Sequence, residues 1–157
     1  MIDTKDEKSW SLYKDGLTKG VFQLESNLGR AWSKRLAPEN LEELAALIAL
    51  IRPGCLKAVI DGKSMTQRFV DRKHKKEDVT YLHDSLESIL KPTYGVLVYQ
   101  EQAMLIAVKL AGFSEMEADN LRKAIGKKKA DLMAEIRGEF VSGCAREGIV
   151  DEHTAKE

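Results

Sequence analysis

The sequence predicts a mainly α-helical fold with one or two short strands, and three observations support this. Apolar residues recur at helical spacing in several stretches, of which residues 41–51 are the most apolar. Residues that typically begin helices, such as Ser and Asp, precede these stretches, and Gly or Pro follows them. Two short runs, residues 21–24 and 96–98, contain the β-branched or aromatic residues that strands favour.

The N-terminal part is predicted to hold two helices separated by a strand. Thr4 and Glu7 have the spacing of a capping box for a short first helix, which the next glycine ends. Residues 21–24 are the predicted strand. Ser26, directly after it, can cap a second helix, and Pro38 ends that helix.

The middle of the chain begins with a helix over residues 39–51, whose wide apolar stripe needs cover from another layer. The Arg-Pro-Gly string at 52–54 ends it. Residues 60–76 are mixed in pattern, with one shared helical face. That face holds Met65, Phe69 and Arg72.

The last part is predicted to be helical. Asp84 caps a short helix, and residues 96–98 are either a buried strand or the first turn of a helix that Gly112 ends. Ser114 and Glu117 form a second capping box for a helix over residues 115–125, with Gly126 as its stop. Residues 130–145 form the last full helix, and the residue at 151 can open another.

Composition excludes several classes of protein. Lys and Arg number 25, as do Asp and Glu, so the formal net charge is zero. This argues against a bulk polyanion binder but permits a local basic site. Cys55 and Cys144 are isolated and are predicted to be buried small residues, and the three histidines stand alone, so no metal site is predicted. No apolar run could span a bilayer, and we expect a soluble cytoplasmic protein without a membrane partner.

The strongest candidate binding residues form a basic run without an acid among them. Asp119 lies three and four residues before the first two, so surface ion pairs are one interpretation. The lysines at 127–129 follow one predicted helix and precede the next, whose positive dipole end would repel them. A bound phosphate would offset this repulsion. The alternative is a solvated charge run at a turn. The candidates are Arg122, Lys123, Lys127, Lys128 and Lys129.

Weaker candidates lie elsewhere in the chain. Arg68, Arg72 and Lys73 belong to a basic stretch whose first interpretation is a solvated face. Gln23 alternates with apolar neighbours on the predicted strand and could face a cleft. Residues 99–102 are predicted to form a buried polar network that fixes the start of a helix.

Three strings closely resemble the alpha subunits of bacterial replicative DNA polymerase III, the C family of polymerases. They are Gly-Val-Phe-Gln-Leu-Glu-Ser at 20–26, Thr-Tyr-Gly-Val-Leu-Val-Tyr-Gln-Glu-Gln at 93–102 and Ala-Asp-Asn-Leu-Arg-Lys-Ala-Ile-Gly-Lys-Lys-Lys at 118–129. The resemblance implies the fingers region of a palm-fingers-thumb polymerase. Residues 1–26 would end the palm and lead into the fingers, and residues 27–157 would form a helical fingers domain truncated at its C-terminus.

The resemblance also implies roles for the candidate residues. Arg122 and Lys123 correspond to the pair that grips the triphosphate of the incoming dNTP, although close relatives commonly have a second Arg at the position of Lys123. The lysines at 127–129 would contact the same phosphates. The basic residues at 68, 72 and 73 would line the path of template-primer DNA.

The sequence lacks the family's catalytic aspartate strings, one like Pro-Asp-x-Asp-x-Asp and one like Asp-Phe-x-Gly. Polymerases use such carboxylates to hold two metal ions, here Mg²⁺ in the intact enzyme. We therefore expect no catalytic or metal-binding residues in this chain, and no activity from it alone. Its expected partners are dNTP, template-primer DNA, the palm and thumb, and replisome subunits. The alternative is a non-catalytic helical module that binds nucleic acid or protein and derives from a polymerase.

Overall fold

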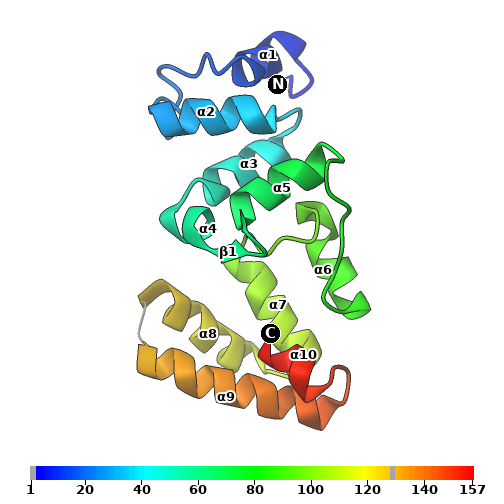
Figure 1. Ribbon diagram of the computed structural model, residues 1–157. Helices are drawn as coiled ribbons and strands as arrows, with labels where there is room; N and C mark the ends of the chain where they lie inside the picture. Colours follow the sequence, from blue (N-terminus) through cyan, green and yellow to red (C-terminus); the bar gives the residue numbers. More distant parts are fainter. Residues whose placement is uncertain (1–2, 128–129) are drawn as a thin grey trace. The chain divides into compact units, whose positions relative to one another are not determined.

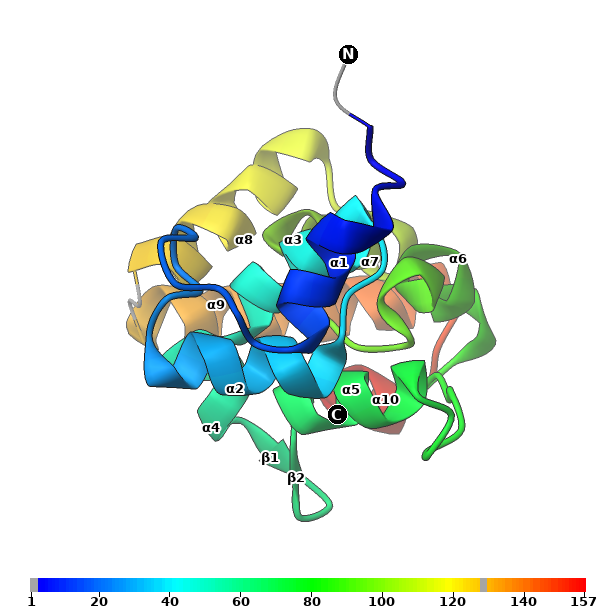
Figure 2. The same ribbon diagram turned by 90° about the horizontal axis from the view of Figure 1, so that it is seen from above.

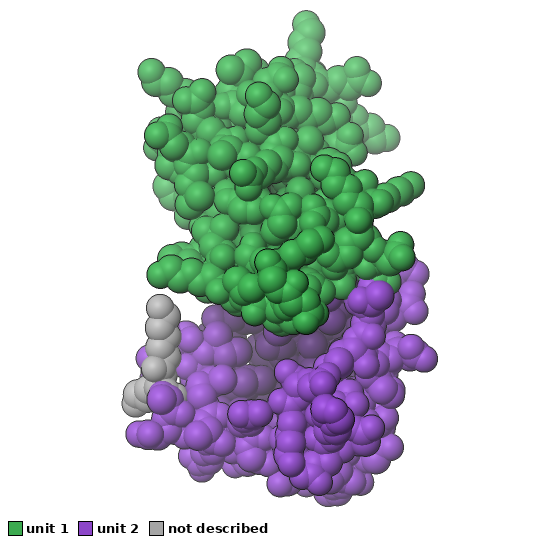
Figure 3. All heavy atoms as spheres, in the orientation of Figure 1, with its two compact units in different colours: residues 1–79 green, residues 80–157 purple. Residues whose placement is uncertain are grey.

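The computed structural model describes residues 3–127 and 130–157, and helices dominate it (Figure 1). The predicted mainly α-helical fold with short strands is confirmed. The chain divides into two compact units, Met1–Val79 and Thr80–Glu157 (Figure 3). The predicted boundary after residue 26 stays a prediction.

Unit 1 contains helices and one small hairpin. Its elements are α1 (Glu7–Lys14), α2 (Asn27–Leu36), α3 (Leu41–Leu50), α4 (Pro53–Lys57), β1 (Val59–Ile60), β2 (Lys63–Ser64) and α5 (Met65–Lys73).

The first two helices begin at side-chain caps. The Asp6 carboxylate accepts a hydrogen bond from the backbone N–H of Ser9 at 2.9 Å. The predicted Thr4 cap is therefore wrong, because the carboxylate nearer the helix takes the capping position. Ser26 caps α2 as predicted, accepting from the N–H of Gly29 at 3.0 Å.

The predicted strand at residues 21–24 is wrong, because the segment forms a turn. The N–H of Leu24 donates to the carbonyl of Val21 at 3.0 Å, and the buried hydroxyl of Thr18 donates to the carbonyl of Leu24 at 2.6 Å. Gln23 has a left-handed backbone with φ of 65°. These local bonds satisfy the backbone groups that a strand would pair with another strand.

The core of unit 1 includes α3 and α5. Leu47 and Leu50 are buried, as is Phe69 on the predicted face of α5. The hydroxyl of Thr66 donates to the carbonyl of Leu50 at 2.8 Å, which ties the start of α5 to the end of α3. The apolar stripe of α3 therefore finds much of its cover within unit 1.

The short strands lie where none was predicted. β1 and β2 lie side by side at one edge of the view in Figure 2. They pair antiparallel, with Val59 opposite Ser64. Asp61 and Gly62 between them have φ of 52° and 76°. An Asp-Gly pair in this conformation is a favoured two-residue hairpin turn.

Unit 2 is built on three longer helices. Its elements are η1 (Asp84–Leu86), α6 (Glu87–Leu90), η2 (Lys91–Thr93), α7 (Gln100–Ala111), α8 (Glu115–Lys127), α9 (Ala130–Glu147) and α10 (Glu152–Lys156). α7 packs against both α8 and α9.

The core of unit 2 joins α7 and α9 closely. Leu110, Ile136 and Cys144 are buried in one apolar cluster. A Cβ on Gly143 would lie 2.3 Å from the carbonyl oxygen of Ala111, so only glycine allows this approach. Cys144 is a buried free thiol, as predicted, whereas Cys55 in unit 1 is only partly buried, so that half of the prediction is wrong.

Several boundaries in unit 2 differ from the predictions. Residues 96–98 form neither a strand nor a helical turn, and the ring of His83, not Asp84, caps η1. The helix that Ser114 and Glu117 cap is confirmed. It continues through Gly126 to Lys127, so the predicted stop is wrong. Within the described residues, no helix combines the length and the apolarity needed to cross a membrane.

Candidate functional site

One face of α8 brings together all three of the predicted phosphate-binding residues that the structure describes. Counted from Asp119 at position i, Arg122 is at i+3 and Lys123 at i+4. Gly126 follows at i+7 and Lys127 at i+8. We call these five residues the basic face of α8. This face carries three positive side chains and one carboxylate, and the three positive side chains are exposed.

Asp119 bridges the first two cations. Its Oδ1 accepts hydrogen bonds from Nε of Arg122 at 2.9 Å and from Nη2 at 2.7 Å. Its Oδ2 lies 2.7 Å from Nζ of Lys123. The ion pairs allowed by the sequence spacing are therefore present, and they hold both cationic side chains over one turn of the helix.

The two cations favour the charged form of Asp119. The hydrogen bond from Lys123, followed by that from Arg122, lowers the pKa of Asp119 below its ordinary value of 3.8. The side chains of Arg122 and Lys123 are still 43% and 49% exposed. The carboxylate thus orders the two cations without removing them from solvent.

Two of the predicted phosphate ligands, Lys128 and Lys129, lie outside the described residues. Ala130 begins α9 directly after them. The first N–H groups of an α-helix lack partners within the helix and attract anions.

The predicted DNA-contacting residues of α5 take part in ion pairs within unit 1. Nε of Arg72 donates to Glu77 at 3.0 Å, and Nζ of Lys73 lies 3.0 Å from Glu43. Arg68 contacts Glu77 at 3.5 Å and donates to the carbonyl of Ile60 at 2.8 Å. Their side chains are 4%, 7% and 17% exposed respectively. The structure gives them a part in packing that the sequence interpretation missed, and DNA contact by them stays a prediction.

Gln23 lies in unit 1, on the turn before α2, and its side chain is exposed. The adjacent Phe22 is 81% exposed. Gly29 on α2 packs under this turn, because a Cβ there would lie 2.8 Å from Cα of Leu24. The turn therefore rests on the helix and presents two consecutive side chains outward.

The predicted polar network at residues 99–102 centres on Gln102. Its Oε1 accepts from the N–H groups of Val98 and Tyr99 at 2.9 and 3.0 Å. Its amide nitrogen donates to the hydroxyl of Thr93 at 2.8 Å and to the carbonyl of Ile89 at 3.2 Å. This network fixes the start of α7 as predicted, but Gln100 and Glu101 are exposed, so the predicted burial is confirmed only for Gln102.

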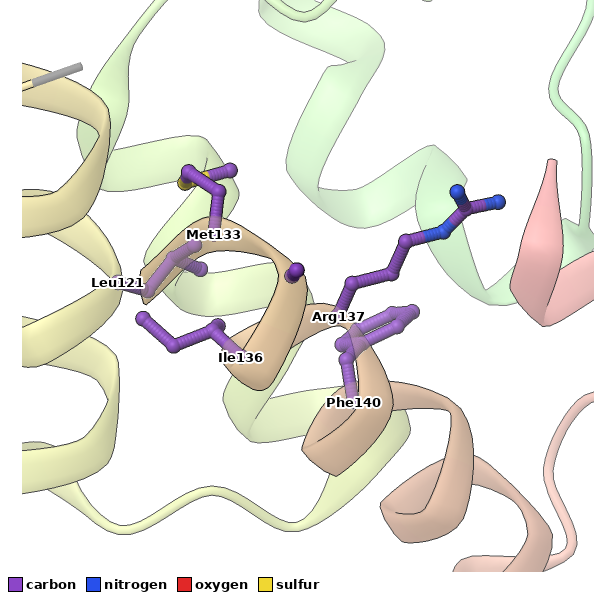
Figure 4. A pocket seen from close by; sticks show the side chains of 6 residues that line it. Leu121, Met133, Ile136, Arg137 and Phe140 are labelled. Carbon is purple, nitrogen blue, oxygen red and sulfur yellow. The ribbon is translucent and has the colours of Figure 1, made fainter. Parts of the chain in front are cut away.

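A pocket of about 420 Å³ opens between α8 and α9 (Figure 4). Its lining is mainly apolar. It consists of Leu121, Met133, Ala134, Ile136, Arg137 and Phe140. The guanidinium of Arg137 donates to the carbonyl of Lys156 at 3.1 Å. The pocket suits an apolar group, whereas the basic face of α8 is an open surface.

Side chains that could bind a metal ion are not clustered among the described residues. Within residues 3–127 and 130–157, no three Asp, Glu, His or Cys side chains lie close enough together to hold a metal ion. The carboxylates nearest the candidate cations, such as Asp119, are engaged in ion pairs.

The chain matches a known protein family over most of its length. The model of the bacterial DNA polymerase III alpha subunit finger domain matches residues 1–148. The chain is 46% identical over 151 residues to DNA polymerase III subunit alpha of Aquifex aeolicus, covering 96% of this chain and 13% of that protein. It is 47% identical over 145 residues to DNA polymerase III subunit alpha of Bacillus subtilis, covering 92% of this chain and 12% of that protein. It is 42% identical over 160 residues to DNA polymerase III subunit alpha of Escherichia coli, covering 99% of this chain and 13% of that protein.

The matched segment thus spans about an eighth of the length of these relatives. The match runs through both compact units and includes the basic face of α8. The chain belongs to the bacterial DNA polymerase III alpha subunit finger domain family.

Proposed function

We propose that this chain is the fingers segment of a replicative DNA-directed DNA polymerase and that the basic face of α8 binds the triphosphate of the incoming dNTP. One observation carries the proposal. Arg122 and Lys123 are ordered by a shared carboxylate and remain about half exposed, with Lys127 one turn further along the same face. Ordered, exposed cations favour phosphate because little side-chain entropy is lost on binding.

The Arg122 guanidinium has a defined orientation for this task. Its Nε and Nη2 atoms both contact Oδ1 of Asp119. Among the contacts within the described residues, Nη1 is the nitrogen left for a phosphate oxygen, and a charge-assisted bond there is stronger than a neutral one. The last carbonyl groups of α8 carry partial negative charge and oppose an anion. Binding must therefore come from the side-chain cations.

Template-primer DNA is part of the same proposal. Among the predicted DNA-contacting residues, Arg68 is the best placed, since its side chain is more exposed than those of Arg72 and Lys73. Scattered cations of this kind give sequence-independent affinity that falls with salt.

Catalysis would depend on the rest of a longer polymerase. We propose that carboxylates outside this chain hold the Mg²⁺ ions, which would stabilise the attacking and leaving oxygens. The palm, the thumb and replisome subunits are the corresponding partners, in the cytoplasm. The 157-residue chain alone should then bind triphosphate but add no nucleotide to a primed template.

Direct binding tests the proposal. Tripolyphosphate and a dNTP are titrated into the 157-residue chain, with amide NMR shifts as the readout at two salt concentrations. We expect shifts centred on α8, weaker binding at high salt, and loss of binding in Arg122→Ala. Lys91→Ala is the matched control, because Lys91 pairs with Glu87 at i,i+4 spacing on another helix. No shift on α8, or equal effects of both variants, would refute the basic face of α8 as the triphosphate site.

A further inference from the structure

Two hollows on the surface of α9 join into one groove, which we call the α9 groove. The pocket between α8 and α9 forms its first part and has a mainly apolar lining (Figure 4). A second hollow of about 420 Å³ lies toward α10, and Ala134 and Arg137 line both hollows. Met133 and Phe140 pack against the core of unit 2 but are only partly buried. The groove therefore leaves apolar surface of α9 uncovered.

α10 points along this groove. The carbonyl of Lys156, at the end of α10, accepts a hydrogen bond from Nη2 of Arg137 at 3.1 Å. Arg137 lies ten positions before Glu147, the last residue of α9, which is about 15 Å along the helix axis. α10 follows α9 after residues 148–151 and packs on it, so it runs back along α9 (Figure 1). A helix that continued in this direction would next pass over Ala134 and Met133.

The sequence of α10 contains no signal that ends a helix. Residues 152–157 include neither Gly nor Pro, and the N–H of Glu157 still donates to the carbonyl of His153 at 3.3 Å. Ala155 lies on the inward face of α10 and packs against the core of unit 2. In a longer helix, the positions three, four and seven residues after Ala155 would share this face. Apolar side chains at those positions would enter the α9 groove.

The present contacts of α10 indicate that packing on α9 holds it in place. A helix of five residues, Glu152–Lys156, is far too short to be stable in water by itself. The last carbonyl groups of a helix lack N–H partners, and here a side chain of α9, Arg137, supplies a donor. A backbone N–H four residues further along would supply the same donor in a longer helix.

We propose that the α9 groove binds an amphipathic helix that continues α10 in a full-length polymerase subunit, with the apolar side chains of that helix filling the groove. The inference rests on the proposed function, in which this chain is one segment of a longer polymerase. The matched segment is about an eighth of the length of the relatives. The competing occupant is a second copy of this chain, because open apolar surfaces also promote self-association.

The experiment compares the 157-residue chain with an extended chain. The extension consists of the about 25 residues that follow the matched segment in the Escherichia coli subunit, since that match covers 99% of this chain. We expect the extension to be helical, to shift the amide NMR signals of residues 133–141, and to raise the melting temperature by about 4–8 °C. The same peptide alone should be largely unfolded, because most helical stability in proteins comes from packing.

Ala134→Lys tests the groove itself. Ala134 is exposed in the 157-residue chain and lysine is a good helix former, so the variant should fold normally without the extension. In the extended chain the ammonium would lie beneath the added helix and should abolish the rise in melting temperature. Ala45→Lys is the matched control, because Ala45 is an exposed alanine within α3 of unit 1. This control should keep the full rise.

Three results would overturn the inference. The first is an extension that stays unfolded or leaves the signals of residues 133–141 unchanged. The second is an equal loss of the rise in Ala134→Lys and Ala45→Lys, because the groove would then not be its source. The third is a dimer of the extended chain that Ala134→Lys dissociates, which would assign the groove to a second copy.

Tripolyphosphate titration of the 157-residue chain separates this inference from the proposed triphosphate site. Binding on α8 together with an unfolded extension refutes the inference and leaves the triphosphate site standing. An extension that packs in the α9 groove, without any binding of tripolyphosphate, supports the inference and refutes the triphosphate site.

Discussion

The ammonium of Lys73 lies 3.0 Å from a carboxylate oxygen of Glu43, and both side chains are more than 90% buried. The same ammonium donates to the carbonyls of Leu36 at 3.0 Å and Ala37 at 2.5 Å. One lysine on α5 therefore satisfies the C-terminal carbonyls of α2 and neutralises an acid on α3. This contact joins three helices of unit 1.

Loss of Lys73 should destabilise unit 1 strongly. Lys73→Met leaves the buried Glu43 carboxylate without its cation, which costs about 3–5 kcal/mol of unfolding free energy. Adding Glu43→Gln should recover part of the loss, because the uncompensated charge is then removed. Denaturant unfolding of the two single variants and the double variant gives the coupling between the residues. Additive effects would show that the two side chains do not interact in solution.

Acid should weaken unit 1 through the carboxylates bound to Lys63. Its Nζ lies 2.9 Å from Asp71 and 3.0 Å from Glu77. The hydrogen bond from Lys63 lowers the pKa of Glu77 below its ordinary value of 4.5, against the opposing effect of burial. Burial raises the pKa of Asp71, but hydrogen bonds from Lys63 and Gln67 outweigh it, so the net pKa lies below 3.8.

When folding lowers the pKa of a carboxyl group, its ionised form stabilises the folded state. This stabilisation is complete at a pH above the pKa of the unfolded chain, and it is lost as the pH falls through the lower pKa of the folded state. We therefore expect constant stability of unit 1 from these groups near neutral pH and a decline below about pH 4.5. Thermal melts from pH 3 to 7 measure it, with Glu77→Gln as the comparison. If Glu77→Gln leaves the acid decline as steep as in the original chain, this network is not its source.

How far the sequence predicts the fold depends on whether the deciding contact is local. The Ser26 cap and the Ser114–Glu117 capping box are contacts over three residues, so spacing alone identifies them. The apolar face of α5 follows from periodicity. The pairing of Lys73 with Glu43 joins residues thirty positions apart, and no local pattern distinguishes it from a solvated basic face.

The strand prediction at residues 21–24 failed for a related reason. Phe22 and Leu24 would share one face of a strand, but Phe22 is exposed and Leu24 is buried, which only the structure shows. A strand also needs a partner edge, which local sequence does not show. The real hairpin could have been found, since Asp61-Gly62 is a strong turn signal. On the candidate site, the sequence indicated the cations and the Asp119 spacing, and the continuation of α8 through Gly126 appeared only in the structure.

The left-handed backbone of Gln23 should lower the stability of unit 1. Its φ of 65° costs a non-glycine residue about 1–2 kcal/mol. Gln23→Gly should relieve that strain while loosening the unfolded chain, for a net gain of up to about 1 kcal/mol. Gln23→Ala keeps the strain and is the control, and denaturant melts compare them. A Gly variant no more stable than the Ala variant would mean that the turn is not left-handed in solution.

Lys123→Arg tests the second cation of the basic face. Arginine keeps the charge and adds a planar fork that suits phosphate oxygens, so dNTP affinity should be unchanged or slightly higher. Single-nucleotide incorporation can be measured in the Bacillus subtilis alpha subunit carrying this segment in place of its own. A large loss of affinity would show that the compact ammonium of Lys123, held 2.7 Å from Asp119, is itself required.

Arg122→Ala in the same chimeric subunit tests the central claim most directly. A charge-assisted contact to a phosphate is worth about 1.5–3 kcal/mol, so kcat/KM for incorporation should fall roughly ten- to a hundredfold, while Lys91→Ala leaves it unchanged. If Arg122 serves only its ion pair with Asp119, its loss costs a few tenths of a kcal/mol in helix stability. A folded Arg122→Ala subunit with the kcat/KM of the unsubstituted chimera would contradict the assignment of the basic face of α8 as the triphosphate site.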